Sequence, residues 1–212
     1  MRVVALPAAN NGRLDRCHME DLSLHILDIV ENSIAAGASH VEIRVRESRR
    51  DDRLSIEIAD DGSGMEEETL ERAADPFFTS RTTRRVGLGL PLFQQAAKAA
   101  GGNFTITSRP GVGTKVSGVF QHSHVDRQPL GDIAQTLLIL VVGNPQVEFS
   151  YLHQSDDSSA SFSTREILAQ LGEIPLHSPQ GIAAVRKSVE KLREQLKDLA
   201  SREEGVHAVG NR

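Results

Sequence analysis

The feature that most constrains this chain is a series of glycine-rich segments, each placed where a strand or helix is expected to begin or end. The first, at residues 60–65, follows an alternating run at 54–59 that predicts a strand. The second, at 87–90, opens a helical pattern, and the third, at 111–114, forms a turn between two expected strands. Glycine lets the backbone approach a ligand closely and adopt positive φ. The series therefore predicts a ligand pocket lined by backbone.

Hydrophobic periodicity predicts helices and strands along the whole chain. Helices are expected where apolar residues recur every three or four positions, and strands where they alternate. The expected helices are 21–36, 66–74, 88–100, 163–171 and 178–199; the expected strands are 41–46, 54–59, 104–108, 114–120 and 146–153; residues 130–142 are read as a helix or helix–strand, and 154–161 as a polar loop.

Composition excludes several classes of function. A net charge of -5 and a sequence pI of about 5.9 argue against a general binder of nucleic acid or of acidic membranes. The absence of tryptophan and the single tyrosine argue against stacking platforms for single strands. The single cysteine, Cys17, permits no intrachain disulfide and fits a reducing compartment, so we expect a cytoplasmic location. No apolar run approaches the length of a membrane span.

The first expected helix carries a polar stripe on an otherwise apolar surface. Asp28 and Asn32 are four residues apart and share one face. An amide oxygen is a suitable ligand for Mg²⁺, which keeps most of its waters, and a carboxylate one turn earlier could orient or deprotonate a water. The alternative is a solvated helix face, and this helix alone does not decide between the two.

The later segments suggest what the ligand is. Asp60 ends a strand, where its carboxylate could accept a hydrogen bond from an adenine amino group, although an ordinary Asp-Gly turn is the simpler reading. The amides at the start of the 88–100 helix suit phosphate, and Arg81 and Arg84 could meet the phosphate tail, unless they belong to a basic surface loop. The fixed order of all these segments argues against coincidence.

Residues 20–120 resemble the gyrase, chaperone, histidine-kinase and mismatch-repair ATPase superfamily. The segments after residue 60 are most similar to the catalytic domain of histidine kinases, and the first helix to the mismatch-repair branch. The resemblance rests on Asp28-Ile29-Val30-Glu31-Asn32-Ser33, Asp60-Asp61-Gly62-Ser63-Gly64-Met65, Pro76-Phe77-Phe78-Thr79, Gly87-Leu88-Gly89-Leu90 and Gly111-Val112-Gly113-Thr114.

The resemblance implies an α/β fold, a two-layer sandwich in which a mixed sheet carries helices on one face. It implies ATP and Mg²⁺ as ligands, with Asn32 on the metal, Asp60 on the adenine amino group and Thr114 near the base. It further implies Gly62, Gly64 and Met65 beside the adenine, Gly87, Leu88 and Gly89 at the phosphates, Phe78, Arg81 and Arg84 in a lid, and Asp28 in the place of a catalytic glutamate that is one methylene longer.

The domain organisation follows from where the resemblance stops. We expect an N-terminal extension at 1–19, the ATPase domain at 20–121, a small C-terminal α+β domain at 122–200 and a disordered tail at 201–212. The long helix at 178–199 has near-heptad apolar spacing, which suits either a homodimer seam or plain packing on a small sheet. We favour plain packing.

Three reactions are compatible with such a pocket. The dimerising hairpin that carries the phosphoacceptor of histidine kinases is missing from its usual place, which favours a regulatory kinase acting on a partner protein. A histidine kinase that phosphorylates a partner or His124 is the second, because residues 124–130 partly resemble a phosphoacceptor box. The third is a binding module switched by ATP and ADP with little turnover.

Overall fold

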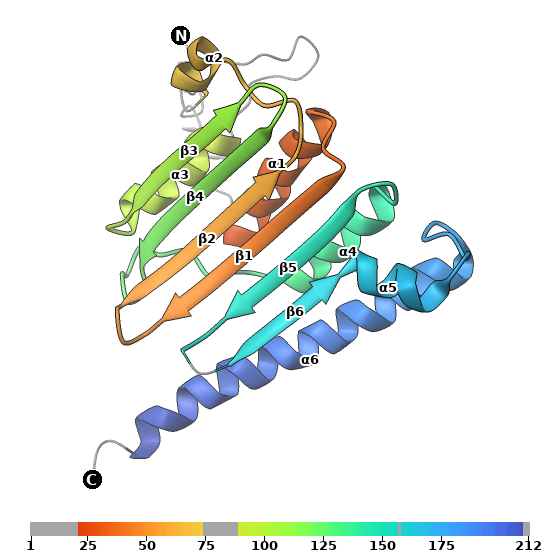
Figure 1. Ribbon diagram of the computed structural model, residues 1–212. Helices are drawn as coiled ribbons and strands as arrows, with labels where there is room; N and C mark the ends of the chain where they lie inside the picture. The colour runs from red at the N-terminus through yellow and green to blue at the C-terminus, as the bar shows by residue number, and fades with distance from the viewer. Residues whose placement is uncertain (1–20, 74–88, 157, 210–212) are drawn as a thin grey trace, which may run out of the picture.

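The computed structural model describes residues 21–73, 89–156 and 158–209, with side chains placed as far as Ser201. Six strands form one mixed sheet in the order β3-β4-β2-β1-β5-β6 (Figure 1). All neighbouring strands are antiparallel except β1 and β5, which are parallel. The strands are β1 (His40–Ser48), β2 (Arg53–Asp60), β3 (Asn103–Arg109), β4 (Gly113–Gln121), β5 (Glu148–Gln154) and β6 (Ser159–Ser163).

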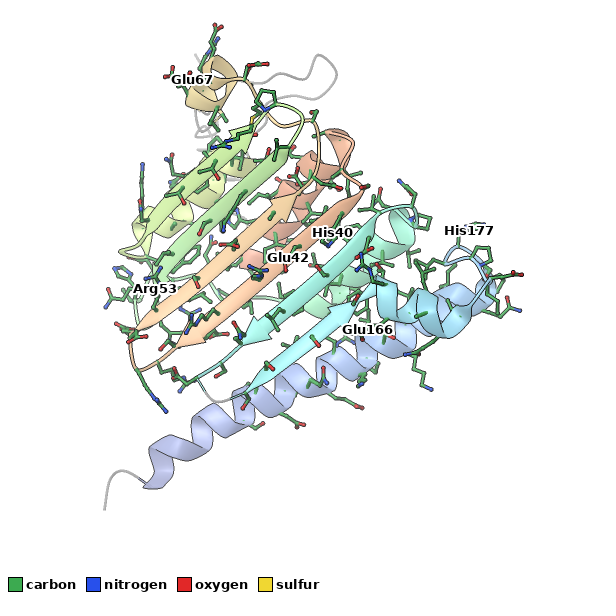
Figure 2. All side chains as sticks on the ribbon, viewed as in Figure 1. His40, Glu42, Arg53, Glu67, Glu166 and His177 are labelled. Carbon is green, nitrogen blue, oxygen red and sulfur yellow. The ribbon has the colours of Figure 1, made fainter. Side chains whose placement is uncertain are left out.

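Helices cover one face of this sheet and leave the other open. Helices α1, α3 and α4 lie behind the sheet in the view of Figure 1, and α6 runs along β6. Side chains such as Glu42 stand on the uncovered face, where Arg44 pairs with Glu42 and Glu57 (Figure 2). The helices are α1 (Leu22–Ala35), α2 (Glu67–Arg72), α3 (Gly89–Ala99), α4 (Ile133–Gly143), α5 (Thr164–Leu171) and α6 (Pro179–Val209). The predicted α/β sandwich is confirmed.

Alternation in the strands places the core between sheet and helices. Val41, Ile43 and Val45 of β1 are almost fully buried, as are their counterparts on β2. Helix α1 begins where the Asp21 carboxylate accepts the Leu24 amide N–H, which is the usual role of an aspartate N-cap. Its buried face, which includes Ile26, packs over β2. Asp28 and Asn32 of the polar stripe are half-buried and lie beside this core face.

The C-terminal part extends the same sheet. Residues 154–161 were predicted to be a polar loop, but β6 begins at Ser159, because Ala160 and Phe162 alternate inward between serines. Strand β5 pairs with β1, and Val189 and Leu192 of α6 are buried within the chain. Helix α6 also continues to Val209, past the expected start of the tail. The division into two domains near residue 121 stays a prediction.

A buried polar network joins the central strands at one end of the sheet. The Glu47 carboxylate of β1 lies 3.0 Å from His122 Nε2, just beyond β4, and 2.9 Å from His153 Nε2 on β5. The Tyr151 hydroxyl lies 3.1 Å from His153 Nδ1. Burial is the largest influence on the Glu47 pKa and raises it, but the hydrogen bonds and charges of His153 and His122 together outweigh burial and lower this pKa to about 2.

This network is expected to make stability depend on pH below 4.5. The folded-state pKa of Glu47 lies below its ordinary value of 4.5, so its contribution is present above pH 4.5 and is lost as the pH falls towards 2. We expect Glu47→Gln to lower the free energy of unfolding by about 2–3 kcal/mol at pH 6 and by progressively less below pH 4.5. Urea unfolding of both proteins across this range measures the difference.

Glu42→Gln is the matched control, because Glu42 lies on the uncovered face of the same strand and pairs with the exposed Arg44. Its effect is expected to stay within about 0.5 kcal/mol at every pH. A constant difference between Glu47→Gln and the natural protein from pH 6 to pH 2.5 would contradict this account of Glu47.

Candidate functional site

Three polar side chains interrupt the apolar face of the sheet at one end. Asp60 ends β2, Thr114 is the second residue of β4 and lies opposite Asp60, and Ser108 lies opposite Thr114 on β3. All three continue the core-facing alternation of their strands, because Ile58, Val116 and Ile106 come two residues away on the same face. The row lies at the head of the β2 arrow in Figure 1, at the opposite end of the sheet from Glu47. A polar row in this place is a candidate binding site.

The Asp60 carboxylate is held by three donors. Its Oδ1 accepts the amide N–H groups of Gly62 at 2.9 Å and Thr114 at 3.2 Å. Its Oδ2 accepts the Ser33 hydroxyl of α1 at 2.6 Å. These bonds fix the orientation of the carboxylate and leave it able to accept one more hydrogen bond, which is the contact expected with an adenine amino group.

Two glycines allow the loops around this row to interlock. Gly64 has a φ of +66°, and a Cβ there would lie 2.0 Å from the Arg109 carbonyl oxygen. Gly113 has a φ of +126°, and a Cβ there would lie 1.9 Å from the Asp60 carbonyl oxygen. The Gly111 amide also donates to the Ser63 carbonyl at 2.8 Å. Side chains at Gly64 and Gly113 would separate the segments that shape the pocket.

Helices α1 and α3 supply the adjoining wall. Asn32 directly precedes Ser33, which bonds Asp60, and Asn32 is half-buried. Within the part of the chain that the structure describes, its amide forms no hydrogen bond, which leaves it available to a ligand. A Cβ at Gly89 would lie 3.1 Å from Asp28 Cβ, so the start of α3 abuts Asp28. The structure thus brings Asp28, Asn32 and Gly89 to the same end of the molecule as the polar row.

Several expected site residues lie outside the described residues. Met65 is described, and its amide donates to Ser108 Oγ at 2.9 Å. The expected site residues outside the described part are Phe78, Arg81, Arg84, Gly87 and Leu88. Their assignment to phosphates and lid stays a prediction.

His124 lies far from this pocket. It follows β4, whereas Thr114 lies near the start of that strand, and β4 has nine residues. The two ends of the strand are therefore roughly 26 Å apart, at about 3.3 Å per residue. His124 Nδ1 accepts the Asp126 amide at 3.1 Å, and the ring is mostly covered. Among the described residues, the polar row and His124 therefore lie at opposite ends of β4.

Ser33 and Ser108 were missed by sequence reasoning, although each carried a signal. Ser33 follows Asn32 on the inward side of α1, and its hydroxyl is buried. Ser108 occupies the position that Phe104 and Ile106 predict to be apolar. A small polar residue at a position where the periodicity predicts an apolar one, near a glycine turn, is the pattern that could have identified Ser33 and Ser108.

The described residues limit other kinds of site. They contain no group of three or more His, Cys, Asp or Glu side chains arranged to hold a metal ion. Among these same residues, no helix combines the length and the apolar character needed to cross a membrane. A magnesium ion held by one amide and by phosphate oxygens would not need such a cluster, so the half-buried Asn32 fits that role.

A known protein family matches the part of the chain that holds the polar row. The family described as histidine kinase-, DNA gyrase B-, and HSP90-like ATPase matches residues 18–123. The sensor protein kinase FleS of Pseudomonas aeruginosa is 39% identical over 106 residues, which is 50% of this chain and 26% of that protein. The histidine protein kinase DivJ of Caulobacter vibrioides is 34% identical over 96 residues, which is 43% of this chain and 16% of that protein.

One solved structure, the N-terminal domain of a DNA repair protein, aligns with 80% of this chain and 56% of its own at 17% identity and a TM-score of 0.49. That score is too low to support a conclusion. The chain spans about a quarter or less of the length of the two kinases. It belongs to the histidine kinase-, DNA gyrase B- and HSP90-like ATPase family, and the matched residues form an ATP-binding, kinase-like domain.

Proposed function

We propose that this chain binds ATP with Mg²⁺ at the polar row and transfers the γ-phosphoryl group to a partner protein. The observation that carries the proposal is the Asp60 carboxylate, which three donors from α1, the glycine loop and β4 hold at the end of an apolar sheet. A half-buried carboxylate oriented in this way can recognise a ligand that donates a hydrogen bond, as the adenine amino group does.

Each wall of the pocket has its own role in this proposal. Asp60 accepts from the adenine amino group, Thr114 lies beside the base, and Gly62, Gly64 and Met65 give the base a close backbone wall. Asn32 holds Mg²⁺ through its amide oxygen. Gly89 and the preceding Gly87 and Leu88 offer helix-start amides to the phosphates, and Phe78, Arg81 and Arg84 close over them.

Asp28 is the proposed catalytic group beside those phosphates. Its carboxylate lies against the start of α3, where Gly89 leaves it room. It would orient the acceptor hydroxyl and take its proton as the phosphoryl group passes from ATP to the acceptor and ADP is left. Arg81 would offset the charge that develops on the transferred group.

A nucleotide-switched binding module is the second candidate. It is favoured by the linker after β4, because the Leu22 amide at the start of α1 donates to the Pro129 carbonyl at 2.9 Å, and by the β1–β5 pairing. The first links the helix that carries Asn32 to the segment after β4, and the second links the sheet to the C-terminal part. Phosphorylation of His124 is a weaker alternative, because the length of β4 separates it from the base site.

A labelling experiment separates these candidates. The purified chain is incubated with Mg²⁺ and ATP labelled on the γ-phosphate, alone and with a lysate of its own cells. Acid-stable label on a lysate protein is the expected result. Acid-labile label on the chain that His124→Ala removes would favour the histidine reaction. Retained ATP binding without transferred label or released phosphate would favour the switch.

Asn32→Ala is expected to abolish the contribution of Mg²⁺ to ATP affinity. The natural protein should bind ATP at least about tenfold more tightly with Mg²⁺ than with a chelator, and the variant should show no such difference, because the amide ligand is gone. Isothermal titration calorimetry measures both affinities. Asn103→Ala, at the exposed start of β3, is the matched control, and an unchanged Mg²⁺ effect in Asn32→Ala would refute the metal assignment.

A further inference from the structure

Ser108 connects the two loops of the pocket through one hydroxyl group. Its Oγ accepts the Met65 amide N–H at 2.9 Å and lies 3.0 Å from the Gly113 carbonyl oxygen and 2.9 Å from Thr114 Oγ1. Met65 belongs to the loop after β2, and Gly113 and Thr114 open β4. Every contact of this hydroxyl is therefore to a residue beside the expected position of the base.

The number of hydrogens determines the direction of these bonds. A serine hydroxyl has one proton to donate and two lone pairs to accept with. If Ser108 donates to the Gly113 carbonyl, both lone pairs are used, one by the Met65 amide and the other by the Thr114 hydroxyl. The reverse arrangement, with Ser108 donating to Thr114, leaves the Thr114 proton without an acceptor among the described residues. The first arrangement is favoured because it satisfies all three neighbours.

This arrangement makes Thr114 an acceptor towards the ligand. Its proton is directed at Ser108, so its free lone pairs are left for the pocket. The Asp60 carboxylate beside it is also an acceptor. The three donors around it, the Ser33 hydroxyl and the Gly62 and Thr114 amides, already donate to that carboxylate. The row therefore offers hydrogen-bond acceptors to the base, and none of these three donors is left to bind it.

We propose that Ser108 is a positioning residue which, by fixing the proton of Thr114, makes the pocket select a 6-amino purine over a 6-oxo purine. This inference rests on the proposed ATP binding. The amino group of adenine donates to the acceptors of the row. The 6-oxo group of hypoxanthine is itself an acceptor, so its contact with the row is repulsive. Without Ser108 the Thr114 hydroxyl rotates and donates to a 6-oxo group, so the selection weakens.

ATP and inosine triphosphate are the probes, because their bases differ only at position 6 and in the proton on N1. Calorimetric titration of the full chain gives both affinities and their ratio. We expect Ser108→Ala to reduce the ATP preference by about tenfold or more, through tighter inosine triphosphate binding and weaker ATP binding. Ser108→Thr keeps the hydroxyl and should keep the ratio. Ser117→Ala, on the uncovered face of β4, is the matched control.

A double-mutant cycle tests whether Ser108 acts through Thr114. Thr114→Val should lower the ratio by itself, and adding Ser108→Ala to it should change the ratio no further. The cycle also covers the case in which Ser108→Ala folds poorly, because Thr114→Val leaves the Met65–Ser108 bond intact. Equal losses for both nucleotides in Ser108→Ala, or an undiminished ratio in Thr114→Val, would overturn the positioning role.

Failure of the proposed function looks different in the same titrations. A natural protein that binds neither triphosphate would refute ATP binding itself and with it the selection by Ser108. A natural protein that prefers ATP, with the same preference in Ser108→Ala, would refute only the role of Ser108.

Discussion

Asp60→Asn is expected to weaken ATP binding by about a hundredfold while leaving the fold nearly as stable as before. The asparagine carbonyl can take the place of Oδ1 and accept the Gly62 and Thr114 amides. Its NH₂ group then replaces Oδ2, and the Ser33 hydroxyl can turn to accept from it and donate to the Ile29 carbonyl, 3.4 Å away. The new NH₂ group would oppose the adenine amino group, donor against donor, which costs about 3 kcal/mol.

Asp61→Asn is the control for this prediction. Asp61 is the neighbouring residue and also accepts backbone N–H groups, from Ser39 and His40, but these bonds lie on the exposed side of the loop. We expect its ATP affinity to stay within about twofold of the natural value. The affinities come from calorimetry and the free energies of unfolding from urea titration. Unchanged ATP affinity in Asp60→Asn would remove Asp60 from the binding site.

Gly113→Ala is expected to cause the largest loss of stability of any single methyl addition near the pocket. The added Cβ would lie 1.9 Å from the Asp60 carbonyl oxygen and 3.0 Å from Asp61 Cα, so β4 must move away from the end of β2. The φ of +126° is also unfavourable for alanine. Together these effects should lower the free energy of unfolding by about 3 kcal/mol or more, and the displaced Thr114 amide should impair ATP binding.

Gly111→Ala separates the effect of backbone strain from the effect of a steric clash. Gly111 has a φ of +71° in the same turn, but a Cβ there meets nothing within 4 Å. Its substitution should therefore cost only the backbone strain, about 1 kcal/mol, and keep ATP binding intact. Circular dichroism during thermal and urea unfolding ranks the two variants. Equal destabilisation of the two would show that the close approach of Gly113 to Asp60 does not hold.

Much of the fold could be predicted because local patterns determine it. The alternation of Val41, Ile43 and Val45 and the helical spacing around Ile26 are short-range signals, and both elements are confirmed. The position of β5 beside β1 could not be predicted, because parallel pairing depends on contacts between residues about a hundred positions apart in sequence. Strand β6 was missed because it has only two apolar residues, Ala160 and Phe162, which alternate with serines that are also common in loops.

Candidate site residues could be predicted where the residue type and its sequence neighbours suggest a ligand, but not where only hydrogen bonds in the folded chain give a residue its role. Asp60 and Gly64 stand out in the sequence, because a carboxylate followed by glycines suggests a ligand loop. Ser33 and Ser108 do not, because their importance comes from hydrogen bonds that only the folded chain forms. The distance of His124 from the pocket likewise follows from the length and direction of β4 rather than from any local motif.

An NMR titration of the ¹⁵N-labelled chain with a non-hydrolysable ATP analogue and Mg²⁺ tests most directly that nucleotide binds at this end of the sheet. The account predicts saturable shifts of the Gly62, Gly64 and Thr114 amides, and of the Asn32 side-chain amide only when Mg²⁺ is present. The amides of His122 and His153, at the other end, should stay in place. Shifts confined to that other end, or none at all, would contradict the account.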